Sequence, residues 1–395
     1  MQTGDGLLAR INLKEGQLSP QQLEALANAA LKYGNGLVEI STRGNVQVRG
    51  LRPDSFEPFA KAIEQAGIAI NDNVPLLVPL LFAHTTERQE QGERLKQALQ
   101  ERLEQTDLFE RLAAKTSLII DAGGMVDLSG QLADVRAVLQ EGEEWSLWIG
   151  GTQETARFAG QVQGAEAAAK AIMTALELMA ARGNMVRGSD LDEEELARIV
   201  EHTDRKDAPR LASSASALIG VQALAGEKWM LGLGLPFGTI NAVPLSTLAQ
   251  ILREAGVEKL MPLPGKILAI VGVSEQLADR LLGRAVELGF ICEEADPRLK
   301  LITCSGAPAC QAALLNTHQA ASDLVEMFAR QFQGDVRVHV SGCEKRCAAH
   351  GQIDLEIVGT PEGIEVANLA AKGPRSTRAE QILYGIAEKL QEQGE

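Results

Sequence analysis

The sequence predicts an α/β protein composed of two similar halves related by a pseudo-twofold axis. Residues 1–70 are patterned as strand, helix, strand, strand and helix. The same order recurs in the second half, where Gly256 and Gly289 end helices as Gly34 and Gly67 do in the first. Each glycine and its counterpart are 222 residues apart. Two equal offsets with a matching element order indicate an internal duplication.

The first helix of the chain has a clear start and a clear end. Ser19 and Gln22 form a capping box, and Pro20 occupies the first helical position. An apolar stripe with helical spacing follows and ends at Gly34. The other elements of this copy are expected at residues 6–13, 37–40 and 46–48 for the strands and at 56–66 for the second helix.

The second copy and the segment between the copies follow the same kinds of pattern. Strands are expected at 229–235 and 267–273, a helix around 245–252 and another from residue 275. Between the copies, the sequence predicts a charged helix at 87–112, strands at 116–120 and 146–149, an alanine-rich helix at 164–182 and a polar stretch at 189–216.

Composition and charge limit the possible functions. The 395 residues are enough for two or three domains, and the net charge of −15 argues against nucleic acid or an anionic membrane as a partner. The sequence shows no signal-peptide pattern and no apolar run long enough to span a bilayer, so a cytoplasmic location is expected. In a reducing compartment the five cysteines are expected to stay free of disulfides.

Four of the five cysteines form two close pairs. Cys304 and Cys310 are separated by five residues that include glycine and proline, so a loop is expected there. Cys343 and Cys347 are four apart, which puts both thiols on one face of a helical turn. A loop and a turn that converge favour a [4Fe–4S] cluster with four thiolate ligands. Zinc, a redox dithiol and unrelated buried cysteines are the alternatives, and Cys292 is expected to be a core residue.

The segment 37–50 is the second feature of interest, because it carries a row of polar side chains. If the backbone is extended throughout, its odd-numbered face carries Arg43, Asn45, Gln47 and Arg49, and Arg52 follows closely. Two arginines and two amides suit a ligand with carboxylates. The alternative is the solvated face of an edge strand.

Together these features resemble the sulfite and nitrite reductase superfamily. The resemblance rests on the cysteine pairs and on Gly342 and Asp354, which flank the second pair at the spacing of that signature. The segments "GDGLLARI", "YGNGLVEISTRGNVQVRGL", "ADPRLKLITCSGAPAC" and "VHVSGCEKRCAAH" are more similar still to the precorrin-3B synthase family, the branch of aerobic cobalamin biosynthesis. That branch typically has a lysine, here Lys345, where the reductases have Pro-Asn.

The resemblance implies an internally duplicated architecture. Two ferredoxin-like half-domains would pair about the pseudo-twofold axis, with two α/β lobes beside them. The expected parts are a first half-domain at 1–72, a cysteine-free lobe at 73–190, a linker at 191–216, a second half-domain at 217–290 and a cluster-binding lobe at 291–395.

The resemblance also implies cofactors and site residues. Cys304, Cys310, Cys343 and Cys347 would bind the [4Fe–4S] cluster, and a mononuclear iron or a sirohaem-like tetrapyrrole is a possible second centre. Lys345 and Lys115 would be catalytic. The substrate-binding residues would be Arg43, Asn45, Gln47, Arg49 and Arg52.

The implied activity is that of a monooxygenase. It would hydroxylate precorrin-3A, an anionic tetrapyrrole, with O2 and close a lactone. An unidentified donor, a ferredoxin or a flavin reductase, would supply electrons through the cluster. Two alternatives remain at this point: a sirohaem-dependent assimilatory sulfite or nitrite reductase, and a noncatalytic iron–sulfur electron-transfer or scaffold protein.

Overall fold

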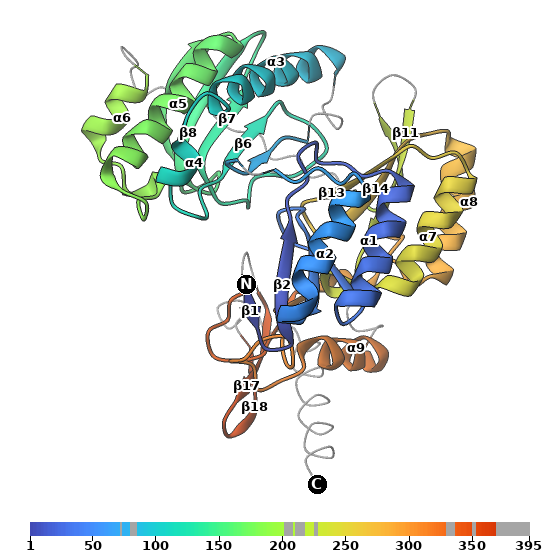
Figure 1. Cartoon of the computed structure of the whole chain (residues 1–395). Coiled ribbons are helices and arrows are strands. Elements are labelled where there is room, and N and C mark those ends of the chain that lie inside the picture. Colours follow the sequence, from blue (N-terminus) through green and yellow to red (C-terminus); the bar gives the residue numbers. More distant parts are fainter. Residues whose placement is uncertain are drawn as a thin grey trace.

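The computed structural model describes residues 1–71, 73–79, 85–200, 208–209, 218–224, 228–328, 336–349 and 353–368. Within these ranges the strands form four sheets, and the longer helices pack beside them (Figure 1). The predicted mixed α/β class is therefore confirmed.

The N-terminal unit is a β-α-β-β-α fold. Its elements are β1 (Gln2–Thr3), β2 (Gly6–Ile11), α1 (Pro20–Tyr33), β3 (Leu37–Ile40), β4 (Val46–Leu51) and α2 (Pro53–Gln65). The capping box before α1 is confirmed, because Gln22 N–H donates to the Ser19 hydroxyl at 3.2 Å and Ser19 N–H donates to the Gln22 side chain at 2.9 Å. Helix α2 starts three residues before the predicted position, with Pro53 in its first turn.

The second unit repeats this fold. It contains β10 (Gly220–Leu224), β11 (Lys228–Gly234), the short 3-10 helix η3 (Pro236–Gly238), β12 (Thr239–Asn241), α7 (Ala242–Glu254), β13 (Lys259–Leu263), β14 (Ile267–Val273) and α8 (Glu275–Glu287). The sequence analysis missed β13. This strand contains Pro262, and proline is a poor predictor of a strand.

Strand pairing confirms the duplication at the level of register. Ile11 of β2 pairs with Val46 of β4. Their counterparts 222 residues further on, Leu233 of β11 and Leu268 of β14, pair in the same way. The offset inferred from two glycines therefore holds for the hydrogen-bonded partners of the sheets.

The two units exchange backbone contacts about the pseudo-twofold axis. Ile240 of β12 pairs with Val38 of β3, which extends the first sheet with a strand from the second unit. The symmetry-related contact joins Leu18 to Leu260 through two backbone hydrogen bonds of 2.8 Å. Helices α1 and α7 lie side by side (Figure 1), and one hydrophobic core serves both units.

The lobe between the two units is built on a second five-stranded sheet, of order β5-β6-β7-β8-β9. Trp145 is fully buried in its core. The helix α6 falls inside the predicted linker, most of whose remainder lies outside the described residues. The elements are β5 (Leu76–Leu77), α3 (Thr86–Leu103), α4 (Leu108–Arg111), β6 (Leu118–Asp121), β7 (Ala133–Leu139), β8 (Glu144–Gly151), β9 (Arg157–Gln163), α5 (Ala165–Arg182), η2 (Gly188–Asp190) and α6 (Glu193–Ile199).

The C-terminal lobe has a smaller sheet of order β15-β16-β17-β18. Its elements are η4 (Pro297–Lys300), β15 (Leu301–Thr303), α9 (Thr317–Phe328), β16 (Val338–Ser341), β17 (Leu355–Thr360) and β18 (Gly363–Asn368). Strands β15, β16 and β17 are parallel. Their carboxyl ends therefore meet at one edge of the sheet, where the cysteine segments follow β15 and β16.

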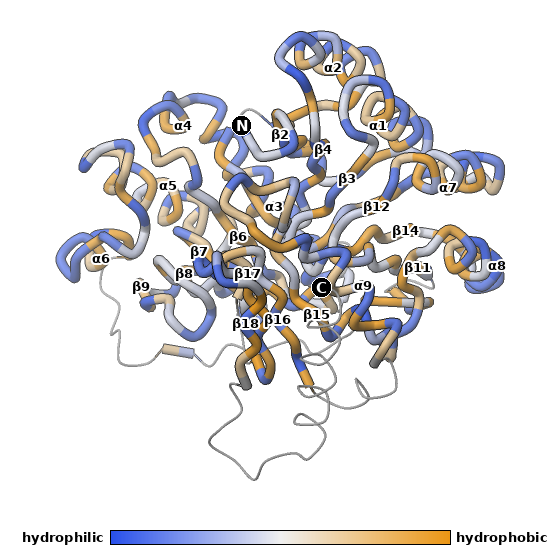
Figure 2. The backbone as a smooth tube through the Cα atoms, turned by 90° about the horizontal axis from the view of Figure 1, so that it is seen from below, coloured by the Kyte–Doolittle hydropathy of each residue, from blue (hydrophilic) through white to orange (hydrophobic). Residues whose placement is uncertain are grey.

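The two copies differ in the face that corresponds to the polar row of β4. Gln47 and Arg49 have the apolar counterparts Ala269 and Val271 in β14. That face of β14 packs against residues of the first lobe in a separate core. Figure 2 shows hydrophobic residues gathered along β11 and β14 and hydrophilic residues on the outer turns of α8. The polar row is thus specific to the first copy.

Among the described residues, no helix has both the length and the hydropathy required to cross a membrane.

Candidate functional site

A cleft of about 620 Å³ lies where the two duplicated units and the two lobes meet. Its wall includes Arg43 and Gln47 from the first unit, Lys115 from the first lobe, Pro264 from the second unit and Cys347 from the C-terminal lobe. The backbone of Arg43 forms a β-bridge with Pro264, so the loops of the two duplicated units join at this wall. The cleft is therefore formed by the duplication itself and not by one unit alone.

Arg43 is a cation of the cleft wall that the protein compensates little. Its side chain is partly buried, and within the described part of the chain its guanidinium has no hydrogen-bond or ion-pair partner. Burial, followed by the positive charges of Arg187 and Arg10, lowers the pKa of Arg43, and Asp134 offsets this only in part. Arg187 itself binds Asp134 at 2.8 Å. An anion in the cleft would relieve this local excess of positive charge.

Two amides continue the polar wall beside Arg43. Asn45 is partly buried, and Gln47 is only 7 % exposed. Neither side chain has a hydrogen-bond partner in the ranges that the structure describes, and both line the cleft. Amides in this position are free to donate to or accept from a bound molecule.

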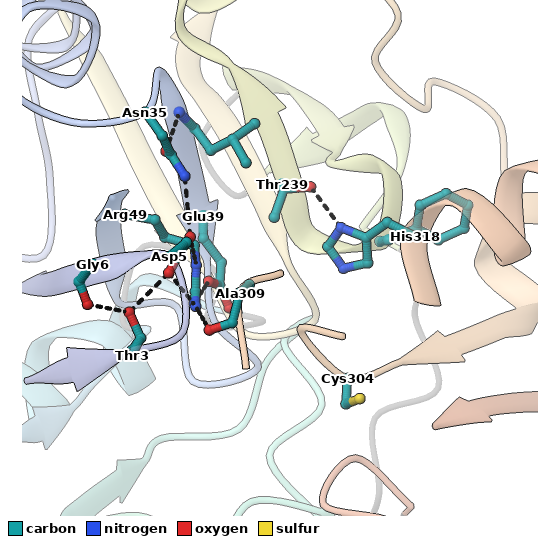
Figure 3. A network of polar contacts seen from close by, with 12 residues as sticks. Thr3, Asp5, Gly6, Asn35, Glu39, Arg49, Thr239, Cys304, Ala309 and His318 are labelled. Atoms are coloured by element: carbon teal, nitrogen blue, oxygen red, sulfur yellow. Dashed lines mark hydrogen bonds and ion pairs between the residues drawn. The ribbon is translucent and has the colours of Figure 1, made fainter. Parts of the chain in front are cut away.

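The other two predicted substrate residues lie elsewhere. Arg49 is 4 % exposed and does not line the cleft, because its guanidinium forms ion pairs with Asp5 and Glu39 at 3.1 and 3.2 Å (Figure 3). Arg52 precedes α2, and its side chain is 71 % exposed beside Asp54. The predicted row is therefore not one continuous strand face: Gly44 has a left-handed φ of 78°, so Arg43 lies in the turn before β4, and only Gln47 and Arg49 lie on the strand itself.

The two predicted catalytic lysines are both exposed. Lys115 lines the cleft, and its backbone carbonyl accepts a hydrogen bond from Arg187 at 3.1 Å. Lys345 lies in the turn between the last two cysteines and is not part of the cleft wall.

The two cysteine segments touch each other at the carboxyl edge of the parallel sheet. Cys304 directly follows β15, and the N–H of Gly342, which follows β16, donates to its sulfur at 3.2 Å. A Cβ atom on Gly342 would come within 2.6 Å of the Ala313 Cβ and 3.2 Å of the Gly306 Cα. Glycine is thus required where the segments cross, and N–H groups directed at sulfur are suited to thiolate ligands.

The predicted helical turn at the second cysteine pair is wrong. Residues 343–349 form bends and turns, and Arg346 has a left-handed backbone with φ 50°. A residue with positive φ cannot continue an α-helix, so Cys343 and Cys347 do not share a helical face. The turn leaves Cys343 partly buried and Cys347 exposed at the cleft.

The fifth cysteine is separate from the two pairs. Cys292 is 5 % exposed in the core that the two duplicated units share. Burial raises the pKa of its thiol to about 11, which disfavours the thiolate that a metal requires. Among the described residues, no three Cys, His, Asp or Glu side chains come together as ligands of one metal ion.

The turn between Cys343 and Cys347 is anchored to the sheet by a buried carboxylate. Glu356 is 5 % exposed and accepts hydrogen bonds from Arg346 Nε at 2.8 Å and from His339 Nδ1 at 2.9 Å. Burial opposes ionisation of Glu356, but the hydrogen bonds from Arg346 and His339 outweigh it and lower its pKa.

This carboxylate gives a prediction for stability against pH. The pKa of Glu356 is lower in the folded protein than its unfolded-state value of 4.5. Ionised Glu356 therefore stabilises the fold at pH values above 4.5, and this contribution is lost as the pH falls through the folded-state pKa. Glu356→Gln is expected to cost about 1–3 kcal/mol near neutral pH. Urea unfolding of both proteins should show this difference shrinking below about pH 4.5, and a difference independent of pH would contradict the assignment.

The sequence analysis did not identify Lys266, which lies close to Cys304. Lys266 has a left-handed backbone with φ 67°, and its ammonium donates to the carbonyl of Phe237 at 3.2 Å. Burial lowers its pKa, although the charges of Glu39 and Cys304 oppose the effect. The duplication held a signal, since Lys266 replaces Gly44 of the first copy, which also has a positive φ.

Comparison with known proteins gives consistent matches. Residues 1–66 match the family model described as the nitrite/sulfite reductase ferredoxin-like half domain. A precorrin-3B synthase from Sinorhizobium sp. is 35% identical over 98% of this chain and 85% of its own length. A ferredoxin–nitrite reductase from Synechococcus elongatus is 23% identical over 96% of this chain and 83% of its own length.

A solved structure supports the same fold. The NirA protein of Mycobacterium tuberculosis superposes with a TM-score of 0.71 at 19% identity, over 91% of this chain and 73% of that one. The duplicated arrangement of half-domains and lobes is therefore an architecture already seen in an experimental structure.

Proposed function

The chain belongs to the precorrin-3B synthase family of the sulfite and nitrite reductase superfamily, and on this premise we propose that it hydroxylates precorrin-3A with O2. The proposed product carries one oxygen atom from O2 and a lactone closed by a ring acetate. The second oxygen atom leaves as water, so each turnover consumes two electrons and two protons. A ferredoxin or a flavin reductase is the proposed source of the electrons.

The observation that carries this proposal is the composition of the cleft. Its wall combines the ammonium of Lys115 with the guanidinium of Arg43 and two amides that have no side-chain partner among the residues the structure describes. Precorrins carry several carboxylates, and charge-assisted hydrogen bonds are the interactions that bind carboxylates most strongly. A local cationic wall reconciles an anionic ligand with a chain whose net charge is −15.

Cys304, Cys310, Cys343 and Cys347 are proposed to hold a [4Fe–4S] cluster. The donor set fits this group, because four thiols lie on two segments in contact, and one sulfur already accepts an N–H at 3.2 Å. When bound, such a cluster supplies single electrons. Cys347 lines the cleft, so a cluster ligand and the proposed substrate would share a wall.

The side chains of the cleft have the following proposed roles. Arg43 binds a substrate carboxylate, while Asn45 and Gln47 orient the macrocycle through hydrogen bonds. Lys115 extends into the cleft wall as an exposed ammonium, where it holds a second carboxylate or supplies a proton from Nζ. Lys345 adds positive charge near Cys343 and Cys347.

Lys266 and Lys345, the two lysines near the cysteines, are expected to affect the reduction potential of the cluster differently. Removing a cation disfavours the more negative, reduced state, so Lys266→Met is expected to lower the midpoint potential by about 50 mV, the equivalent of roughly 1 kcal/mol. Lys345 is exposed, and solvent and salt screen its charge. Lys345→Met should therefore change the potential much less. Redox titrations of both variants in one buffer test this order, and a larger shift for Lys345→Met would contradict it.

An anaerobic preparation tests whether the tetrapyrrole is a substrate or a cofactor. The proposal expects iron and acid-labile sulfide with a broad visible shoulder, and precorrin-3A that binds and leaves. Sharp tetrapyrrole bands that copurify with the protein would instead support a sirohaem-dependent sulfite or nitrite reductase. Protein with a cluster but no affinity for either tetrapyrrole would support the noncatalytic iron–sulfur alternative.

A further inference from the structure

Arg49 lies at the opposite end of the polar row from Arg43. Its Nε and Nη2 bind the two carboxylate oxygens of Asp5 at 3.1 and 3.3 Å, and its Nη1 binds Glu39 at 3.2 Å. Two carboxylates therefore compensate one guanidinium that is 4 % exposed. This arginine has no uncompensated positive charge to offer a substrate, unlike Arg43.

The same guanidinium reaches the first cysteine segment. Arg49 Nη2 donates to the carbonyl of Ala309 at 2.9 Å, and Ala309 directly precedes Cys310. Figure 3 shows this contact together with both carboxylates and Cys304. The contact spans 260 positions of the chain and joins the first unit to the C-terminal lobe.

The N-terminal hairpin, formed by the antiparallel strands β1 and β2, supports the same carbonyl from a second direction. The N–H of Gly4 donates to Ala309 at 3.0 Å. A Cβ atom at Gly4 would lie 2.3 Å from the carbonyl oxygen of Pro308, so the backbone contact requires glycine. Asp5, the next residue, is fixed by Thr3 at 2.8 Å and by Asn35 at 3.0 Å. The hairpin and Arg49 thus hold the loop as one unit.

We propose that Arg49 is a positioning residue for the loop 304–310, and that Asp5, Glu39 and the N-terminal hairpin hold its guanidinium against the carbonyl that precedes Cys310. This role rests on the proposed function in one respect, namely that Cys310 is a cluster ligand. A fork bound to two carboxylates and a carbonyl fixes the loop in angle as well as in distance. The loop is then already in place when the cluster binds, which slows later loss of the cluster.

Arg49→Met tests this proposal in full-length protein purified anaerobically. Loss of a charge-assisted hydrogen bond should raise amide hydrogen exchange in peptides that cover 304–314 and speed the loss of the cluster to an iron chelator by about tenfold. The electron paramagnetic resonance signal of the reduced cluster should broaden, because the Cys310 sulfur becomes less well ordered. General destabilisation alone would leave that signal unchanged.

Gly4→Ala displaces the hairpin from the loop and leaves no buried charge unpaired, so it tests the same contact if Arg49→Met folds poorly. It should raise exchange in the same peptides. Arg298→Met is the matched control, because the Arg298 side chain makes three hydrogen bonds to the carboxylate of Asp296 and one to the carbonyl of Gly289, and neither partner belongs to the loop 304–310. It should change neither the exchange of 304–314 nor the rate of cluster loss.

Two results would overturn the proposal. One is unchanged exchange and cluster loss in both Arg49→Met and Gly4→Ala. The other is an Arg49→Met protein that loses affinity for precorrin-3A while its cluster is lost at the rate of the unmodified protein. If the unmodified protein holds no iron or sulfide, the proposed function fails, but the exchange comparison still decides whether Arg49 positions the loop.

Discussion

Replacing Cys304, Cys310, Cys343 or Cys347 with alanine is expected to abolish the [4Fe–4S] centre. Each iron of the cluster requires one thiolate, and in the part of the chain that the structure describes the fifth cysteine is buried in a different core. Iron and sulfide analysis with visible spectroscopy measures the loss. The effect should be nearly complete for each of the four variants.

Cys292→Ala is the matched control for these variants. Its thiol has its pKa raised to about 11 and packs in the core of the two duplicated units, so the cluster should survive its removal. An intact cluster in the Cys347→Ala protein would contradict the four-ligand assignment. Stoichiometric zinc in place of iron and sulfide would contradict it as well.

Arg43→Ala is expected to weaken binding of precorrin-3A by about 1.5–3 kcal/mol, the value of a hydrogen bond to a charged group. The reason is that Arg43 is partly buried in the cleft wall and, among the described residues, has no protein partner that the substitution would leave unpaired. Equilibrium titration under anaerobic conditions measures the effect. The cluster content should not change.

Arg52→Ala provides the control for Arg43→Ala. Arg52 is 71 % exposed at the side chain and lies outside the cleft wall, so its removal should alter affinity little. Equal losses in the two variants would indicate a general effect of charge on an anionic ligand. Unchanged binding in Arg43→Ala would return this end of the polar row to the solvated-face alternative.

The duplication was predictable because glycine and capping patterns are local signals. Gly34 and Gly67 end helices through short-range geometry, and their 222-residue offset from Gly256 and Gly289 carries over to the pairing of the strands. Alternation along β4 was predictable for the same reason. A strand places every second residue on one face wherever it lies in the fold.

The division of that face could not be predicted from the sequence. Alternation placed Arg43 and Arg49 on one face, but a left-handed Gly44 puts Arg43 in the turn before β4, and the environments of the two arginines come from the other unit, the N-terminal hairpin and the C-terminal lobe. The left-handed conformation of Arg346 was equally hidden, because a four-residue spacing is compatible with helix and with turn. Contacts between distant segments decided each of these points.

The most direct test of the central claim is turnover of precorrin-3A under labelled oxygen. Anaerobically purified protein with its cluster, an electron donor and ¹⁸O2 should yield a tetrapyrrole that is heavier by one labelled oxygen atom. Mass spectrometry of the product measures this incorporation. A protein that holds the cluster and binds precorrin-3A but leaves the tetrapyrrole unlabelled would contradict the proposed oxygenation.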